Sequence, residues 1–416
     1  MRTRTSVGDV IVLVGLLAAA PTRAMADSFV VGTGDPIQDA ANVQTAVDAG
    51  GVVSLWGSFD FSGTETGSPL RVVTVRSSVD VIGIPDGDGA LPTIRGGQEA
   101  FFIDAPSADV SIEGLHLVDQ TFSAIHVASV GSARIEGCRI EGVRPQFLPA
   151  QAQFVAIGII IAGSLVPGAV VGSVEVVGND VDVTGAATDS TLGIYGQVVT
   201  VAGVGQVDRV TIARNRVTNA TGHGIDLRSL GSAAIAVIER NEVTVATSAR
   251  SGEPGPPDRL ITGIRCLGVG TYTIRENSVT THHANAAGIR LQSTVGASVE
   301  RNQVYLALAE ETAPLGQAAG VQLIRGALAN LVCRNAVHGR GWSAVSVSGP
   351  PAGTSQGNLL VRNDHAGLGA TFADVDVGAG VLDTTIVGED GLVVDSGTGT
   401  VRLSGNKHAN TLPDCL

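Results

Sequence analysis

The sequence predicts an all-β solenoid in which short parallel strands wind through about ten coils. Three observations predict it. An asparagine-centred phrase recurs along the chain, a second phrase of a small residue followed by Ile or Val falls between its copies, and the composition is aliphatic and rich in glycine. Hydrophobic residues make up 44% of the chain but aromatic residues only 3%, and 55 of the 416 residues are glycine. Such a chain is too apolar to be disordered, and its core must be aliphatic.

The chain opens with the features of an export signal. Two arginines precede an apolar stretch at 10–20 that is too short to span a bilayer, and residues 24–26 (AMA) fit the small-x-small rule for cleavage. We therefore predict a signal peptide over 1–26 and a secreted or periplasmic protein.

The next segment predicts a helix that caps the first coil. Apolar residues recur at helical spacing from Ile37 to Val47, and Gly50-Gly51 ends the pattern. The first coil of a solenoid exposes an apolar end and open strand edges, which a short amphipathic helix can cover. We expect the N-terminal cap and first coil over 27–70, the β-helix over 71–406 and a C-terminal tail over 407–416.

The asparagine phrase reads apolar, x, x, Asn, x, apolar. Stacked on an identical residue one coil away, a buried asparagine can form a ladder and bond the backbone of its turn. Leu115 and Cys138 take the place of the asparagine in the earlier copies. The clear copies carry Asn179, Asn215, Asn241, Asn277, Asn302 and Asn335, and worn copies carry Asn363 and Asn406.

The second phrase occurs as HGIDL, TGIRC, AGIRL and AGVQL, among others, and it predicts one of about three short strands in each coil. Successive asparagines lie 25 to 43 residues apart, and most of this variation precedes the second phrase. Insertions are thus tolerated at one corner, which is typical of a solenoid whose loops project from one edge. The main insertions are 143–156, 245–260 and 308–319.

Together the two phrases resemble the right-handed parallel β-helix repeat of the pectate-lyase-like superfamily. The resemblance covers roughly residues 37–406, and the phrase IQDAANVQTAVDAGGVVSLWG is similar to the capping start of such β-helices. It implies a right-handed helix with an N-terminal capping helix, and a polysaccharide groove on the sheet that carries the Gly-Ile phrases. It does not imply one activity, because the superfamily includes lyases, hydrolases, epimerases and adhesins.

Outward-facing residues of the Gly-Ile strands should form two columns along the rod, and the middle of these columns is polar. The candidate substrate-binding residues are Tyr195, Asp226, Arg228, Arg265, Arg290 and Gln292. Arg265 and Arg290 should lie one coil apart with no acid between them, so an anionic ligand would relieve their repulsion. The alternative is that Asp226 pairs with Arg265 and water screens the rest.

The phrase GHG at 222–224 is similar to the GHG motif of polygalacturonases, but its partners are missing. Leu192 stands where the preceding coil should carry an aspartate, and Leu267 stands where the motif's Arg-x-Lys segment should carry its lysine. Asp226 alone cannot be both acid and base in an inverting hydrolysis. We therefore interpret His223 as a turn residue, with a role in binding as the alternative. For a lyase or epimerase, an arginine base remains open.

A net charge of −13 argues against a nucleic-acid partner, which requires a basic surface, and no stretch after the signal is apolar and long enough to span a membrane. Cys138, Cys266 and Cys333 are expected to be packed small thiols, and we predict neither a metal site nor a cofactor.

Three functions remain. The leading one is binding, with processing left open, of an anionic extracellular polysaccharide or cell-surface glycan. The others are a structural or adhesive surface rod, and a polysaccharide lyase or epimerase with an arginine base.

Overall fold

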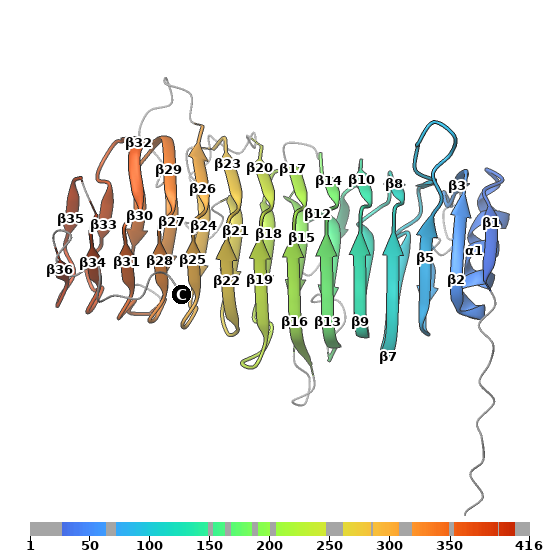
Figure 1. The fold of residues 1–416 in the computed structure, drawn as a ribbon, viewed down its shortest axis with the longest axis horizontal. Helices are drawn as coiled ribbons and strands as arrows, with labels where there is room; N and C mark the ends of the chain where they lie inside the picture. Colours follow the sequence, from blue (N-terminus) through green and yellow to red (C-terminus); the bar gives the residue numbers. More distant parts are fainter. Residues whose placement is uncertain are drawn as a thin grey trace, which may run out of the picture.

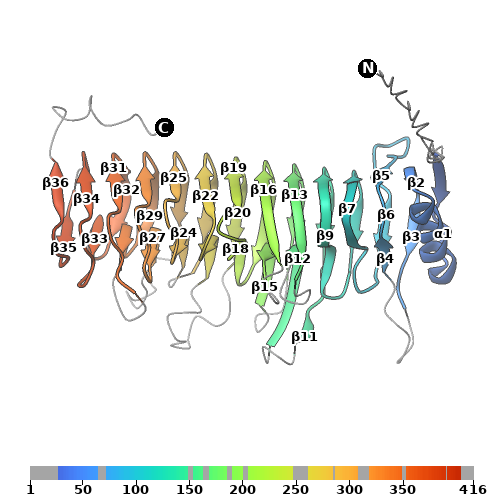
Figure 2. The ribbon, with the colours of Figure 1, turned by 90° about the horizontal axis from the view of Figure 1, so that it is seen from below.

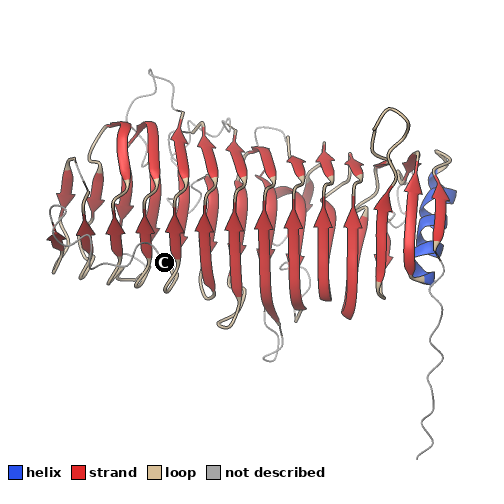
Figure 3. Cartoon of the chain, in the orientation of Figure 1, coloured by secondary structure: helices blue, strands red, loops and turns tan. Residues whose placement is uncertain are grey.

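The chain forms a long rod of stacked coils, in which nearly all regular structure is strand (Figures 1 and 3). This computed structural model describes residues 27–63, 72–148, 153–162, 168–184, 190–199, 205–246, 261–283, 286–307, 318–348, 353–389 and 391–403. The predicted signal peptide and tail, residues 149–152 of the first predicted insertion and most of the other two insertions lie outside the described residues. The rod is the right-handed parallel β-helix that the sequence predicts, and neighbouring coils pair strand on strand in parallel register.

Three series of strands run along the rod. The first carries the Gly-Ile phrases and is called the site sheet here; its strands overlie one another down the rod in both views (Figures 1 and 2). It contains β4 (Val73–Val75), the first parts of β7 (Phe101–Glu113) and β9 (Ser123–Glu136), β12 (Gln153–Ala162), β15 (Ser190–Gln197), β18 (His223–Arg228), β21 (Thr262–Leu267), β24 (Ala287–Gln292), β27 (Ala319–Ile324), β30 (Ser343–Val347), β33 (Val375–Val377) and β35 (Val393–Asp395).

The second series leads into each asparagine, and the third follows it. The second contains β1 (Ser28–Val31), β2 (Gly51–Trp56), β5 (Val79–Gly83), the later parts of β7 and β9, β13 (Val170–Val177), β16 (Gln206–Ala213), β19 (Ile235–Glu239), β22 (Thr271–Arg275), β25 (Ser298–Glu300), β28 (Leu331–Cys333), β31 (Leu359–Val361), β34 (Thr385–Val387) and β36 (Val401–Leu403). The third contains β3 (Ser58–Asp60), β6 (Thr93–Arg95), β8 (His116–Val118), β10 (Arg139–Glu141), β14 (Asp180–Asp182), β17 (Arg216–Ala220), β20 (Glu242–Val245), β23 (Ser278–Thr281), β26 (Gln303–Leu306), β29 (Ala336–Gly341) and β32 (Asp364–Ala370). A short strand, β11 (Gln146–Leu148), pairs antiparallel with β12.

The predicted N-terminal helix, α1 (Pro36–Ala49), lies across the first end of the rod (Figures 1 and 2). It ends at Gly50 as expected, and Val43 and Val47 are buried in the core. One part of the predicted apolar face is wrong, because Ile37 is 70% exposed. Asp39 is buried in its place, and its carboxylate accepts hydrogen bonds from the backbone of the segments beside the helix. Among the described residues, no helix is long and apolar enough to cross a membrane.

The asparagine ladder is confirmed from Asn179 to Asn363, and the predicted copy at Asn406 lies outside the described residues. The Oδ1 atom of each ladder asparagine accepts a hydrogen bond from the backbone N–H of the asparagine one coil earlier, at 2.9–3.0 Å. The same Oδ1 accepts a second bond from the Nδ2 of that earlier asparagine. The ladder begins at the backbone of Cys138 and ends on the carboxylate of Glu389. A second, shorter ladder joins Asn330 to Asn358.

The glycine of the Gly-Ile phrase is explained by a close approach between two series of strands. A Cβ at Gly224 would lie 2.2 Å from Cγ1 of Val243 on β20 and 2.8 Å from the carbonyl oxygen of Gly263. The core of the rod therefore has room for a valine on the third series only because the site sheet carries no side chain opposite it. The same contact recurs at Gly158, Gly193, Gly263, Gly288 and Gly320.

Two of the three cysteine predictions are confirmed, and one is wrong. Cys138 and Cys266 are free and buried in the main core. Cys333 is disulfide-bonded. It does not join the main core but packs with Val361 and Val387 in a separate cluster on β28, β31 and β34.

Candidate functional site

The predicted outward column on the site sheet is confirmed by strand register. Tyr195 on β15 pairs with Asp226 on β18, which pairs with Arg265 on β21, which pairs with Arg290 on β24. The column continues to Gln322 on β27. The second predicted column lies two residues further along each strand and contains Gln197, Arg228, Leu267, Gln292 and Ile324.

The first column is buried although it lies on the outer side of the sheet. Asp226 has no exposed surface, Arg290 is 1% exposed and Arg265 is 5% exposed. Arg228 and Gln292 in the second column are partly exposed. The cluster therefore has a buried row of charged groups and a partly exposed rim beside it.

Asp226 is held by two arginines. Arg265 donates from Nε to Oδ1 at 2.8 Å and from Nη2 to Oδ2 at 2.7 Å, and Arg228 donates to Oδ2 from Nε at 2.8 Å. Burial alone would raise the pKa of the Asp226 carboxyl, but the guanidinium groups of Arg265 and Arg228 outweigh it and hold that pKa well below its usual range. The ion pair that the sequence left as an alternative is therefore present for Arg265. A carboxylate engaged in this way is permanently ionised and cannot act as a general acid.

Arg290 is the exception in the cluster. Its Nε donates to Oε1 of Gln322 at 2.9 Å, but its Nη2 is buried and has no hydrogen-bond partner. Burial, and then the charge of Arg265, lowers the pKa of Arg290 to about 9, so that the group is still cationic at neutral pH. Arg228 and Arg265 pair with the Asp226 carboxylate and Arg290 does not, so the cluster carries an excess of positive charge in a chain whose net charge is −13.

The remaining predicted residues lie around this cluster. The guanidinium carbon of Arg228 is 5.2 Å from the centre of the Tyr195 ring, within range of a cation–π contact, and the Tyr195 hydroxyl donates to Gln197. Gln292 lies on the same strand as Arg290, one outward position further on. The structure thus brings five of the six predicted residues into one contiguous group and places Gln292 at its rim.

Two residues of the cluster were not in the predicted set. Gln322 lies next to Arg290 in the first column, and its Oε1 accepts a hydrogen bond from the Nε of Arg290. His223 is not a turn residue but the first residue of β18, 8% exposed, and its Nδ1 has no hydrogen-bond partner. Burial first, and then the charge of Arg265, lowers the pKa of His223 well below its ordinary value. The GHG phrase at 222–224 pointed to His223, but the sequence could not show whether this histidine lies in a turn or in the site.

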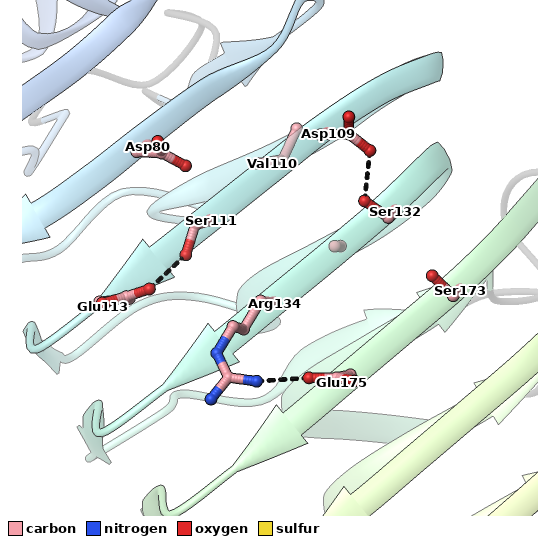
Figure 4. Close-up of a pocket in the computed structure, with 10 residues that line it drawn as sticks. Asp80, Asp109, Val110, Ser111, Glu113, Ser132, Arg134, Ser173 and Glu175 are labelled. Atoms are coloured by element: carbon pink, nitrogen blue, oxygen red, sulfur yellow. Dashed lines mark hydrogen bonds and ion pairs between the residues drawn. The ribbon is translucent and has the colours of Figure 1, made fainter.

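A hollow lies on the outer face of β5, β7, β9 and β13, away from the site sheet (Figure 4). It is a groove of about 410 Å³ lined by Asp80, Asp109, Glu113 and Glu175, with Arg134 as its cation. Arg134 is paired with Glu175 across the groove. Four carboxylates around one guanidinium repel an anion, so this groove does not suit an acidic ligand. Within the described ranges, no group of three or more His, Cys, Asp or Glu side chains is arranged to hold a metal ion.

No family model and no curated protein sequence matches the chain. Among solved structures, it is similar to PfbA, a surface adhesin of Streptococcus pneumoniae, with 12% identity and a TM-score of 0.47 over 90% of this chain and 91% of that one. It is similar to the Dettilon tailspike protein, with 13% identity and a TM-score of 0.45 over 82% of this chain and 68% of that one. It is also similar to the periplasmic alginate epimerase AlgG, with 12% identity and a TM-score of 0.40 over 82% of this chain and 80% of that one. Likenesses at this level carry no argument about what the chain binds or does.

Proposed function

We propose that this chain is a secreted or periplasmic protein that binds an acidic polysaccharide on the outer face of its site sheet, with an acid group of the polymer held by Arg290. The observation that supports the proposal is the unpartnered Nη2 of a guanidinium that is 1% exposed. A buried charge without a counter-ion is costly, and an anion that accepts a hydrogen bond from Nη2 would offset the cost.

The neighbouring residues support a sugar polymer rather than a free ion. Arg228, Gln292 and Gln197 are partly exposed along the rim, and they present guanidinium and amide groups on β18, β24 and β15. Parallel strands repeat at about 4.8 Å, so Gln197 and Arg228 lie one spacing apart, and Gln292 lies two spacings beyond Arg228 with Leu267 between them. Such a row suits the hydroxyl groups of an extended chain of sugars, while the buried arginine supplies the selection for charge.

Binding is tested with a panel of acidic and neutral polysaccharides, measured by calorimetry against the purified chain. We expect acidic polymers to bind and neutral ones not to bind. The Arg290→Met variant should weaken binding by about 2–5 kcal/mol, which is the usual cost of removing one partner of a buried charged pair. The control is Arg275→Gln, which removes an exposed arginine that pairs with Glu239 on another face of the rod. Binding that is equal for neutral polymers, or unchanged in Arg290→Met, refutes the proposal.

A lyase or epimerase with an arginine base is the second candidate. Arg265 is an unsuitable base because both its Nε and its Nη2 donate to Asp226. Arg290, whose pKa is lowered, is the arginine better suited to act as the base. Turnover would generate unsaturated sugars with ultraviolet absorbance, or a changed ratio of sugar epimers in the polymer. Either product, lost in Arg290→Met, supports the enzyme. Attachment to cells without binding to any polysaccharide supports the structural or adhesive rod instead.

A further inference from the structure

Two buried polar atoms of the cluster lack a hydrogen-bond partner, and they belong to different residues. One is Nη2 of Arg290, and the other is Nδ1 of His223. His223 begins β18, and β21 lies between that strand and β24, which carries Arg290. Two strand spacings, about 9.6 Å, separate β18 from β24, and the register places Ala287, three residues before Arg290, opposite His223. The charge of Arg290 acts on His223, so the two side chains share one electrostatic environment.

The two atoms require different partners. Nη2 of Arg290 is a donor on a cation and is matched by an acid group. His223 is a neutral imidazole, because burial and the charge of Arg265 oppose its protonation. A neutral imidazole has one donor and one acceptor nitrogen, and Nδ1 is the donor in one tautomer and the acceptor in the other. A hydroxyl group both donates and accepts, so it satisfies Nδ1 in either tautomer, whereas a carboxylate can only accept.

We propose that Nδ1 of His223 binds a free hydroxyl group of the polysaccharide beside the acid group held by Arg290, which makes His223 a specificity-determining residue. This inference rests on the proposed function, because Arg290 must hold the ligand's acid group. It adds a second requirement, that a hydroxyl near the acid group is not esterified. Acylation would remove the hydroxyl proton and add bulk beside a ring that is 8% exposed, where little space remains.

The position of His223 is fixed by the backbone on both sides. A Cβ at Gly222 would lie 2.9 Å from Oγ of Ser190, and the close approach of Gly224 to Val243 leaves no room for a side chain there. The ring is therefore presented from a strand end that cannot shift toward its neighbours. A hydrogen bond from such a preorganised group discriminates between ligands more strongly than one from a mobile side chain.

The test uses one acidic polysaccharide in two forms, with its O-acetyl groups and after mild de-O-acetylation. We expect the wild-type chain to bind the de-O-acetylated form about tenfold more tightly or better, which is the worth of one buried hydrogen bond. His223→Phe should weaken that binding about tenfold and bind both forms alike. His223→Asn, whose amide keeps a donor and an acceptor near Nδ1, should retain part of the preference. His338→Phe, on β29 of the third series, is the control for replacing a histidine elsewhere.

The outcomes separate this inference from the proposed function. Equal binding of the two forms by the wild type, or wild-type behaviour of His223→Phe, overturns the role of His223, while loss of binding in Arg290→Met still supports the acid site. Failure of the wild type to bind either form overturns both. If His223→Phe does not fold, as judged by its melting temperature, then His223→Asn and the acetylation preference of the wild type decide the matter.

Discussion

Replacing Asn277 with alanine should break the asparagine ladder near its middle. The Asn277 side chain makes five hydrogen bonds, three from Nδ2 to the carbonyl oxygens of Ile238 and Arg275 and to Oδ1 of Asn302, and two accepted by Oδ1 from the backbone and side chain of Asn241. Without Oδ1, the backbone N–H of Asn241 and one N–H of its amide lose their acceptor inside the core. Each unsatisfied buried donor costs about 1–3 kcal/mol, so we expect a loss of about 4 kcal/mol.

Two measurements check this value. Denaturant unfolding gives the change in the free energy of unfolding, and hydrogen exchange should show lost protection in the strands that flank the gap, β20 and β23. Gln303→Ala is the matched control, because Gln303 is an exposed amide on the adjacent strand β26 and should change stability by less than about 0.5 kcal/mol. If Asn277→Ala costs no more than Gln303→Ala, the ladder does not hold the coils in register.

Asn277→Asp replaces the amide with a carboxyl group of nearly the same shape, which can ionise. An ionised carboxylate only accepts, so one of its oxygens would face the carbonyl oxygen of Ile238 and Oδ1 of Asn302 without a proton between them. The folded state therefore raises the pKa of the new carboxyl above its unfolded value. Stability is then greatest at low pH and falls as the pH rises through the folded-state pKa. A variant whose stability is independent of pH would contradict this account.

Three further predictions concern the site sheet and the end of the rod. Arg290→Met should raise the melting temperature of the ligand-free chain, because it removes a buried cation without a counter-ion; a lower value would mark Arg290 as structural. Gly224→Ala should cost about 1–3 kcal/mol by overpacking against Val243, and Val243→Ala in the same chain should restore part of the loss in denaturant unfolding. Glu389 lies 3.5 Å from His365 and raises the pKa of the imidazole. The free energy of unfolding should therefore fall as the pH rises above 6.5, the ordinary histidine value, and His365→Gln should abolish this pH dependence.

The fold could be predicted because two interactions repeat once per coil. The ladder bonds at Asn215 and the close contact at Gly224 each need one residue type at one place, and both recur in successive coils through the middle of the rod. Once the Gly-Ile phrases were aligned, the register of the strands followed, and Asp226, Arg265 and Arg290 fell into adjacent positions. A periodic sequence thus determines the register of the backbone, and the register is what could be predicted.

The chemistry of the site could not be predicted in the same way. Whether Asp226 pairs with one arginine or two depends on side-chain conformation, which repeats do not encode. The burial of the site could not be predicted either. An outward position on an isolated sheet is expected to be exposed to solvent, yet Arg290 and His223 are buried. The helix shows the same limit, since the apolar spacing favoured Ile37 as a core residue but backbone hydrogen bonds made Asp39 the buried one.

The ladder has a direction, and this has a consequence for how such a rod could lengthen. Every amide donates toward the next coil and accepts from the previous one, so a duplicated middle coil would find a donor on one side and an acceptor on the other. Glu389 accepts from Asn363 but has no amide to donate onward. Growth by duplication is therefore chemically neutral inside the ladder and less favourable beyond its carboxylate end, where the side chain of Glu389 offers an added asparagine acceptors and no donor.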